Sequence, residues 1–186
     1  MKSNFVKTLL SQHEFDDSTN MVDLLKDQLE HDGFECTITE GHLFFEAQDK
    51  MYGVPLEESA LGSYARKVGL IFFRGAEGSD EIPDEHLSRL GSLAMLKTDS
   101  DATVIWNGEN YMIYYRTDIR SLKEFRKLRD YAIKQIDIAS DFLAHVYPSL
   151  YESCRQTQSH KVGFQMHKEV DESMLPAAGK SVNNPQ

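Results

Sequence analysis

The side chains that most often carry catalysis or hold metals are few in this sequence, and their spacing suits neither task. Cys36 and Cys154 are the two cysteines, and no CxxC motif is present, so neither a zinc site nor a disulfide framework is predicted. Cys36 falls on the buried side of an expected strand among acidic residues, whereas a nucleophilic cysteine needs exposure and positive charge nearby. No histidine pairs with another three or four residues away on an expected helix; the seven are His13, His31, His42, His86, His145, His160 and His167. We predict no catalytic residue and no metal site.

Two further stretches have the residue types of a ligand site without its pattern. Gly75–Asp80 contains two glycines, but its acids would repel a phosphate, and neither GxxxxGK[ST] nor GxGxxG occurs. Asp16, Asp17, Asp99 and Asp101 lack the glycine and the twelfth-position glutamate of a calcium loop, and no GxSxG motif is present. We therefore expect a protein that is not an enzyme and uses no cofactor. A site assembled from distant residues, for a small molecule or a reaction, is the least favoured alternative.

The composition is that of an ordinary globular protein. The chain has 186 residues, of which 40% are hydrophobic, so one domain with appendages is expected. No run approaches the roughly 18 uncharged apolar residues of a membrane span, and the first ten residues are too polar for a secretory signal. We expect a cytoplasmic protein with no membrane partner.

The formal net charge of −10 is unevenly distributed. Glu14 to Glu58 holds thirteen acids against Lys26 and Lys50, whereas Arg116 to Lys134 holds seven basic residues against three acids. Such a charge asymmetry can steer a charged partner or align two copies, although a solvated surface explains it more simply. The overall acidity argues against nucleic acid as a partner, because phosphate contacts need a basic surface.

A β-hairpin followed by a long amphipathic helix, Thr103 to Val146, is the stretch that the other elements must fit. Its strands, Thr103–Trp106 and Tyr111–Tyr115, are β-branched and aromatic, and Asn107-Gly108 supplies the positive φ of a tight turn. Ser121 and Glu124 form a capping box that predicts a helix from Leu122, and we expect Pro148 to end it. Its apolar stripe is Leu122, Phe125, Leu128, Ala132, Ile136, Ala139, Leu143 and Val146.

Both faces of this hairpin are apolar, which predicts an interface. One face holds Val104, Trp106, Tyr111, Ile113 and Tyr115 and is expected to bury against the long helix. The other face holds Ile105, Met112 and Tyr114, which would remain as an exposed patch of the kind that marks binding surfaces. We predict that these three residues bind a client protein or a second copy of the chain. Coverage by the N-terminal segment or by Met51–Tyr64 is the alternative.

A second hairpin is expected from Phe34 to Ala47 around a Glu40-Gly41 turn. With that turn Ile38 pairs with Leu43, Cys36 with Phe45 and Phe34 with Ala47, which predicts that all six lie on the buried face.

The remaining elements follow from periodicity and from breaking residues. Met21–His31 and a segment from Pro83 to about Leu96 are predicted helices, and Arg66–Arg74 is a predicted interior strand. Met51–Tyr64 contains Gly53, Pro55 and Gly62 and is expected to be a connection with one helical turn. The fold class is therefore α+β, an antiparallel five-stranded sheet with helices packed on it, in the order α-βββ-α-ββ-α. We expect an N-terminal extension over residues 1–19, the domain over 20–148 and a largely flexible tail over 149–186.

This order resembles that of the class I type III secretion chaperones and of the related YbjN-like domains. The resemblance covers about Asn20 to Val146 and is carried by an aspartate-rich lead-in, Leu96–Asp101, before the Thr103–Tyr115 hairpin and the capped final helix. Members of these groups have no catalytic residues, and the chaperones are dimers that hold a segment of a secreted protein against apolar patches.

Together these features predict a non-catalytic, chaperone-like protein-binding module that holds a protein or peptide partner, as a homodimer. A YbjN-like regulatory domain that acts through protein contacts is the alternative.

Overall fold

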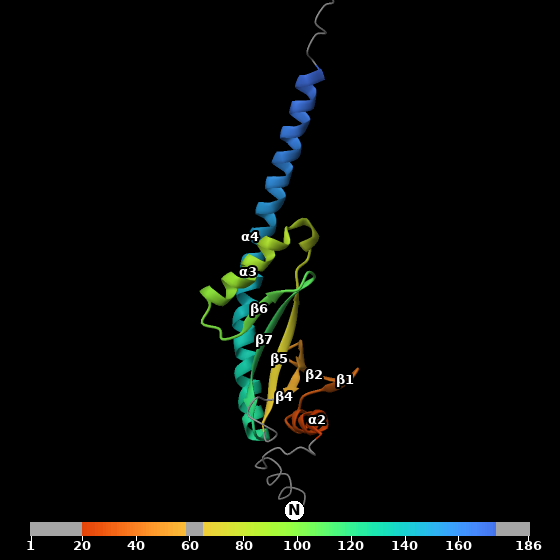
Figure 1. Cartoon of the computed structure of the whole chain (residues 1–186), viewed down its shortest axis with the longest axis vertical. Coiled ribbons are helices and arrows are strands. Elements are labelled where there is room, and N and C mark those ends of the chain that lie inside the picture. Colours follow the sequence, from red (N-terminus) through yellow and green to blue (C-terminus); the bar gives the residue numbers. More distant parts are fainter. Residues whose placement is uncertain (1–19, 59–64, 174–186) are drawn as a thin grey trace, which may run out of the picture.

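A seven-stranded antiparallel sheet organises the fold (Figure 1). In a computed structural model, which describes residues 20–58 and 65–173, the strand order is β1-β2-β3-β5-β7-β6, with β4 paired to β5. The strands are β1 (Cys36–Thr39), β2 (His42–Ala47), β3 (Lys50–Val54), β4 (Leu56–Glu58), β5 (Arg66–Gly75), β6 (Thr103–Trp106) and β7 (Asn110–Ile119). The helices are α2 (Met21–His31), the 3₁₀ turn η1 (Ser79–Glu81), α3 (Asp84–Lys97) and α4 (Leu122–Ser173).

The predicted α+β class with an antiparallel sheet is confirmed, but the number of strands is not. The connection predicted over Met51–Tyr64 contains β3 and β4 instead; residues 59–64 lie outside the described residues, as does the predicted extension over 1–19. A Cβ atom added at Gly53 would lie 2.8 Å from Cγ2 of Ile71 and 3.3 Å from Cε1 of Phe44. The lack of a side chain at Gly53 allows Ile71 and Phe44 to pack closely against the strand. This glycine therefore lies in a strand and does not mark a loop.

The predicted register of the Phe34–Ala47 hairpin and the predicted faces of the Thr103–Tyr115 hairpin are confirmed. Cys36 pairs with Phe45 and Ile38 with Leu43 across a turn in which Glu40 and Gly41 both have positive φ, 51° and 80°. The prediction that this whole set is buried was wrong for Ile38, which is 40% exposed because β1 is an edge strand. In the other hairpin Trp106 pairs with Tyr111 across the four-residue loop 107–110, and Val104, Trp106, Tyr111 and Ile113 lie on the same face, as predicted.

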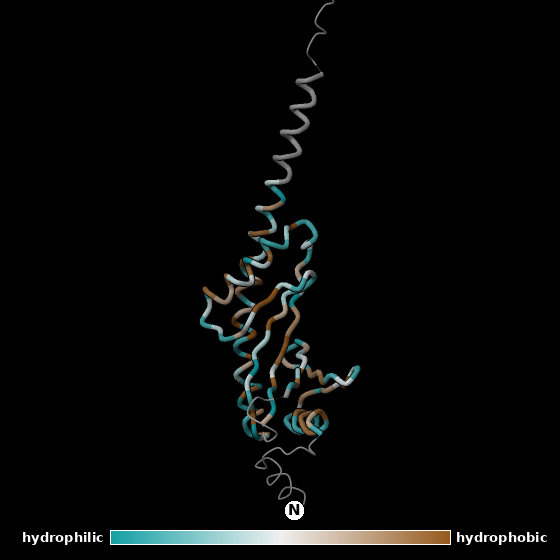
Figure 2. The backbone as a smooth tube through the Cα atoms, viewed as in Figure 1, coloured by the Kyte–Doolittle hydropathy of each residue, from teal (hydrophilic) through white to brown (hydrophobic). Residues whose placement is uncertain are grey.

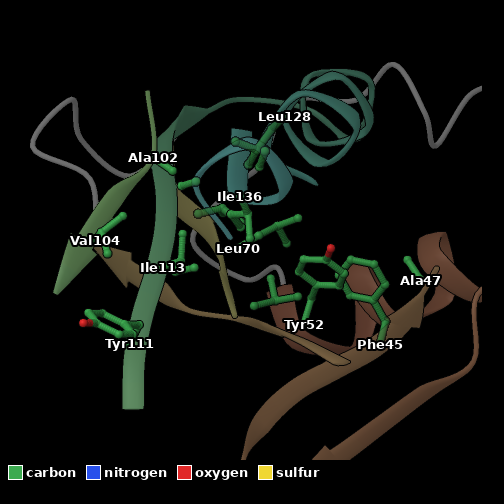
Figure 3. Packing of buried hydrophobic residues seen from close by; sticks show 14 of the residues in the cluster. Phe45, Ala47, Tyr52, Leu70, Ala102, Val104, Tyr111, Ile113, Leu128 and Ile136 are labelled. Atoms are coloured by element: carbon green, nitrogen blue, oxygen red, sulfur yellow. The ribbon is translucent and has the colours of Figure 1, made fainter. Parts of the chain in front are cut away.

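The α-helices of the described residues, α2, α3 and α4, pack on one face of the sheet. Residues of α4 spaced three or four apart are buried against β5 and β7, while α2 covers β1 and β2 and α3 lies over β6. Figure 3 shows Leu70, Ile113 and Tyr52 on the sheet side of this core and Ile136 of α4 above them. The predicted stripe from Leu122 to Leu143 is buried throughout, so this part of the helix was predicted correctly.

The helix α4 begins at the predicted residue and continues past the predicted end. Ser121 Oγ accepts a hydrogen bond from the Glu124 N–H at 3.3 Å, and the Glu124 carboxylate accepts one from the Arg120 N–H at 2.7 Å. The prediction that Pro148 ends the helix was wrong, because α4 runs on to Ser173.

Contacts on both sides of Pro148 explain this continuation. A proline inside a helix removes one backbone hydrogen bond at a cost of about 3 kcal/mol. Here the Tyr147 hydroxyl donates to the Glu77 carbonyl at 2.9 Å, and the Tyr151 hydroxyl donates to the Glu81 carboxylate at 3.1 Å. These bonds tie the helix to the loop before α3 on either side of the proline. Of the tail predicted over 149–186, residues 149–173 are therefore helical, and 174–186 lie outside the described residues.

Candidate functional site

The face of the sheet opposite the helices is the candidate binding surface, and we call it the open face. On β5, β6 and β7 its residues alternate with the buried ones, and the register places Phe73 and Ile105 on either side of Met112, and Ile71 beside Tyr114. The three residues predicted to bind a partner, Ile105, Met112 and Tyr114, therefore lie together. The apolar residues of the open face are Phe44, Met51, Ile71, Phe73, Ile105, Met112 and Tyr114.

Several of these side chains are largely in contact with solvent in the described chain. Phe73 is 49% exposed, Met51 51% and Ile105 41%, whereas Met112 and Tyr114 are half-buried. Figure 2 shows the hydrophobic positions that run along β5, β6 and β7. None of the described helices covers this face, because α2, α3 and α4 all contribute to the core on its other side. The arrangement offers a flat apolar surface with no directional chemistry.

An ion pair borders the open face where β4, β5 and β7 run together. Arg116 Nη1 lies 2.9 Å from Glu57 Oε1, and the Arg116 guanidinium is 5.7 Å from the centroid of the Tyr114 ring. Both charged side chains are about half exposed, so the pair contributes little to stability. It gives the apolar surface a polar rim, which is the usual composition of a protein interface.

Polar groups on the covered side fix α4 to the sheet instead of forming a reactive site. The Asp137 carboxylate pairs with the Lys50 ammonium and accepts a hydrogen bond from the Tyr52 hydroxyl at 3.2 Å. Burial, with the Asp137 charge nearby, raises the pKa of Tyr52, so its hydroxyl stays protonated and acts as a donor. This cluster positions the helix, with Tyr52 buried and the Lys50 and Asp137 side chains 27% and 23% exposed.

A second charged cluster holds α2 against the start of α4. Asp32 pairs with Arg126 at 2.7 Å and with the buried Arg129 at 2.5 Å, and the Arg129 guanidinium also lies 4.7 Å from the ring centroid of Phe34. Burial alone would raise the pKa of Asp32, but hydrogen bonds from Arg129 and Arg126 outweigh it and hold the pKa below its ordinary value. These arginines belong to the basic start of the last helix noted in the sequence, and here they serve an internal contact.

Among the described residues with possible catalytic chemistry, one cysteine and one histidine, Cys154 and His86, are in contact. Cys36 is half-buried, and burial, with the Glu30 charge nearby, raises the pKa of its thiol, which is the opposite of what a nucleophile needs. Cys154 Sγ lies 3.7 Å from His86 Nδ1, on α4 and α3. The described histidines, His31, His42, His86 and His145, are exposed. The side chains of His13, His160 and His167 lie outside the described ones.

The Gly75–Asp80 stretch is a loop that leads into η1, as its sequence indicates. A Cβ atom at Gly78 would lie 2.6 Å from the Tyr151 ring, so this loop packs directly on α4. Within residues 20–58 and 65–173, no group of three or more His, Cys, Asp or Glu side chains is placed to hold a metal ion. Among the helices of the same ranges, none combines the length and hydrophobicity that crossing a membrane requires.

A groove between α3 and α4 was missed in the sequence. It has a volume of about 700 Å³ and lies beyond the end of the sheet, where α4 passes Pro148. Its lining is mostly apolar: Pro83, His86, Arg89, Leu90, Leu93, Val146, Ser149, Leu150, Ser153, Cys154 and Thr157. The signal that could have revealed it is the spacing of Val146, Leu150 and Cys154, which extends the apolar stripe of α4 past the proline.

Comparison with known proteins found a likeness of structure but none of sequence. No protein-family model matches the chain, and no curated protein matches it by sequence. Among solved structures it is similar to YbjN, a proposed transcription regulator from E. coli, with a TM-score of 0.42 and 11% sequence identity. The alignment covers 66% of this chain and 91% of the YbjN chain. At this level of likeness no function is transferred from YbjN.

Proposed function

We propose that this protein is a non-catalytic, cytoplasmic protein-binding module that holds a protein or peptide partner on the open face and assembles as a homodimer. The observation that carries the proposal is the exposure of Phe73 and Ile105 on a sheet face that none of the described helices covers. An antiparallel sheet commonly leaves one face in water, but that face is then polar. Here it is apolar from Phe44 on β2 to Ile105 on β6.

The hydrophobic effect supplies the driving force for a partner. Complete burial of a large apolar side chain is favourable by about 1.5–3 kcal/mol. With several such side chains partly exposed on one surface, a partner that covers them gains several kcal/mol before the cost of association. Apolar patches that remain on a folded protein mark interaction surfaces for this reason.

The shape and rim of the open face favour a protein over a small molecule. The surface lies across three neighbouring strands and is bordered by the Arg116–Glu57 pair, so it offers area and a polar edge rather than an enclosed cavity. Small-molecule sites are concave and bury most of their ligand. An extended peptide or the apolar side of another domain fits such a surface.

The two narrower versions of this proposal differ in the partner. A chaperone resembling the type III secretion group would hold a segment of a secreted client, and a regulator of the YbjN-like sort would hold a resident protein. Both would use an apolar sheet face without catalytic residues.

Substitutions at Ile105 and Ile38 test the proposal. The two positions are matched, because both are isoleucine and they are 41% and 40% exposed. Ile105→Glu alters the open face, whereas Ile38→Glu alters the edge strand β1. Affinity capture followed by mass spectrometry is expected to recover one protein with the wild type and with Ile38→Glu, and to lose it with Ile105→Glu. Calorimetry with the purified pair should then give at least a tenfold loss of affinity for Ile105→Glu alone.

Equal binding by both variants, with unchanged thermal stability, would place the binding site elsewhere and overturn the proposal. A partner that Ile38→Glu also loses would point to general misfolding, which circular dichroism of each variant checks independently. A small molecule seen on the purified protein by native mass spectrometry and retained by Ile105→Glu would favour a ligand-binding function instead.

A further inference from the structure

The groove between α3 and α4 is a second apolar surface, separate from the open face. Leu90 and Leu93 line it from α3, and Val146, Leu150 and Cys154 line it from α4. The three α4 residues recur every four positions, so they form one side of that helix. Two helices that diverge around an apolar floor form a groove suited to a third helix.

The helix α4 extends well beyond the rest of the described chain. Figure 1 shows its C-terminal part standing clear of α3, η1 and the sheet up to its end at Ser173. A single helix in water is marginal, because most helical stability in proteins comes from packing against a partner. This part of α4 therefore needs another surface beside it.

The outer side of α3 adds uncovered hydrophobic area next to the groove. Leu93 is 37% exposed, Met95 38% and Leu96 79%. Figure 2 shows the hydrophobic positions at the C-terminal end of this helix. The groove and the end of α3 together form an apolar region that the described chain leaves open.

We propose that this region is the homodimer interface, in which α4 of a second copy lies in the groove between α3 and α4. The two copies are related by a twofold axis perpendicular to α4, which makes the two α4 helices antiparallel, and the C-terminal part of each α4 covers the partner's groove. The occupant is a second copy because each chain carries both the groove and a projecting helix that continues directly from it. One symmetric contact covers both the groove and the projecting part of α4. A helix from a different protein would fill the groove but would not cover the projecting part of α4.

The inference rests on the homodimer part of the proposed function and places the interface away from Ile105 and Tyr114. Both open faces then remain free, so the dimer presents two partner-binding surfaces. The dimer interface and the partner-binding surface therefore consist of different residues, and separate variants can test each one.

Light scattering on the full-length chain at micromolar concentrations tests the interface. The wild type is expected to have the mass of a dimer, and Leu93→Glu the mass of a monomer, because it places a charge in the groove. Ile105→Glu is the matched control: its parent side chain has similar size and exposure, and the variant should remain a dimer. Leu150→Glu, on the α4 side of the groove, should behave like Leu93→Glu, and circular dichroism with a melting curve establishes that each variant is folded.

A monomeric wild type would overturn the inference. The inference would also be overturned if Leu93→Glu stayed dimeric and Ile105→Glu became monomeric, with both variants folded. The interface would then lie on the open face. Loss of partner capture by Ile105→Glu in a dimer of normal mass would support the proposed function and the interface together.

Thiol cross-linking tests whether the groove lies in the dimer interface, close to the twofold axis. Cys154 lies in the groove and Cys36 lies on β1, so a short bifunctional maleimide should join two chains of Cys36→Ser but not of Cys154→Ser. Absence of the cross-link in a sample shown to be dimeric would contradict this placement of the axis.

Discussion

The two faces of the β6–β7 hairpin are made of similar residues but have different environments. Val104, Tyr111 and Ile113 are at most 3% exposed under α3 and α4, whereas Ile105, one residue along β6, is 41% exposed on the open face. The strands, the turn and the hydrogen bonds are common to both faces. The difference arises from the helices, which pack on one side only.

This difference shows how an apolar residue can serve either folding or binding. On the covered face, burial stabilises the monomer; on the open face, the same free energy becomes available only when a partner arrives. Substitutions at paired positions should therefore affect stability on one face and association on the other.

The largest expected effect comes from truncating a fully buried residue of the covered face. Ile113→Ala should lower the free energy of unfolding by about 2–5 kcal/mol, because it removes three carbons from a packed core and leaves a cavity. Ile105→Ala makes the same chemical change across the sheet and should cost less than about 1 kcal/mol. Urea denaturation of both variants measures the difference. Equal losses would contradict the assignment of a covered and an open face.

The next effect concerns the ion pairs that hold α2 over the covered side. Asp32→Asn should lower the free energy of unfolding at neutral pH by about 1–3 kcal/mol, because the buried Arg129 then keeps only its ion pair with the exposed Asp130, at 2.8 Å. The exposed Asp27 on the same helix is the control, and Asp27→Asn should be nearly neutral.

The pH dependence of the same variant gives an independent measurement. The pKa of Asp32 is lower in the folded chain than its ordinary value of 3.8, so its stabilising contribution is present above pH 3.8 and is lost as the pH falls through the folded value. Stability measured from pH 5 downward should therefore fall less steeply in Asp32→Asn than in the wild type. Parallel pH profiles would show that this contact contributes nothing.

A smaller effect is expected from a single hydroxyl group. The buried Tyr111 hydroxyl donates a hydrogen bond to the Leu87 carbonyl at 2.9 Å, and burial raises its pKa. Tyr111→Phe should cost about 0.5–1.5 kcal/mol, because the Leu87 carbonyl loses its donor in a buried site. Tyr114→Phe, on the open face, should be close to neutral. Thermal unfolding distinguishes the two, and a larger loss for Tyr114→Phe would mean that the open face is packed.

The smallest effect on stability is expected at Phe73. Phe73→Ser should lower the free energy of unfolding by at most about 1 kcal/mol, because the ring is 49% exposed and only about half of the free energy of complete burial is lost. Phe72→Ser should cost clearly more, since the neighbouring ring packs against Tyr52 with centroids 5.8 Å apart. A fluorescent dye that binds apolar surface should also bind less to Phe73→Ser. A substantial loss of stability at Phe73 would show that another part of the chain covers this face.

The sequence contained enough local information to predict most elements, the register of the Phe34–Ala47 hairpin and the two faces of the Thr103–Tyr115 hairpin. The turns at Glu40-Gly41 and Asn107-Gly108 determine which residues of the flanking strands lie on the same face of the sheet. The capping box at Ser121 and Glu124 marks the start of α4. These features depend on residues within a few positions of one another, so they are readable without the fold.

The site could be predicted in part. Ile105, Met112 and Tyr114 share the open face as expected, but Phe73 and Met51, which are at least as exposed, were not identified because strand alternation does not reveal which neighbours lie beside them. The groove between α3 and α4 was missed because Pro148 indicated a helix end.

The sequence by itself determined the α+β class, the pairing within the Phe34–Ala47 hairpin, the two faces of the Thr103–Tyr115 hairpin and the start of α4, because turn geometry, alternation and capping act over short distances. The tertiary structure alone decided that Gly53 lies in a strand, that α4 passes Pro148 and that one apolar face is covered while the other is open. Those outcomes depend on residues distant in the chain: Ile71 beside Gly53, Glu77 and Glu81 beside Tyr147 and Tyr151. Packing between segments far apart in sequence supplied the free energy that overrode the local signals.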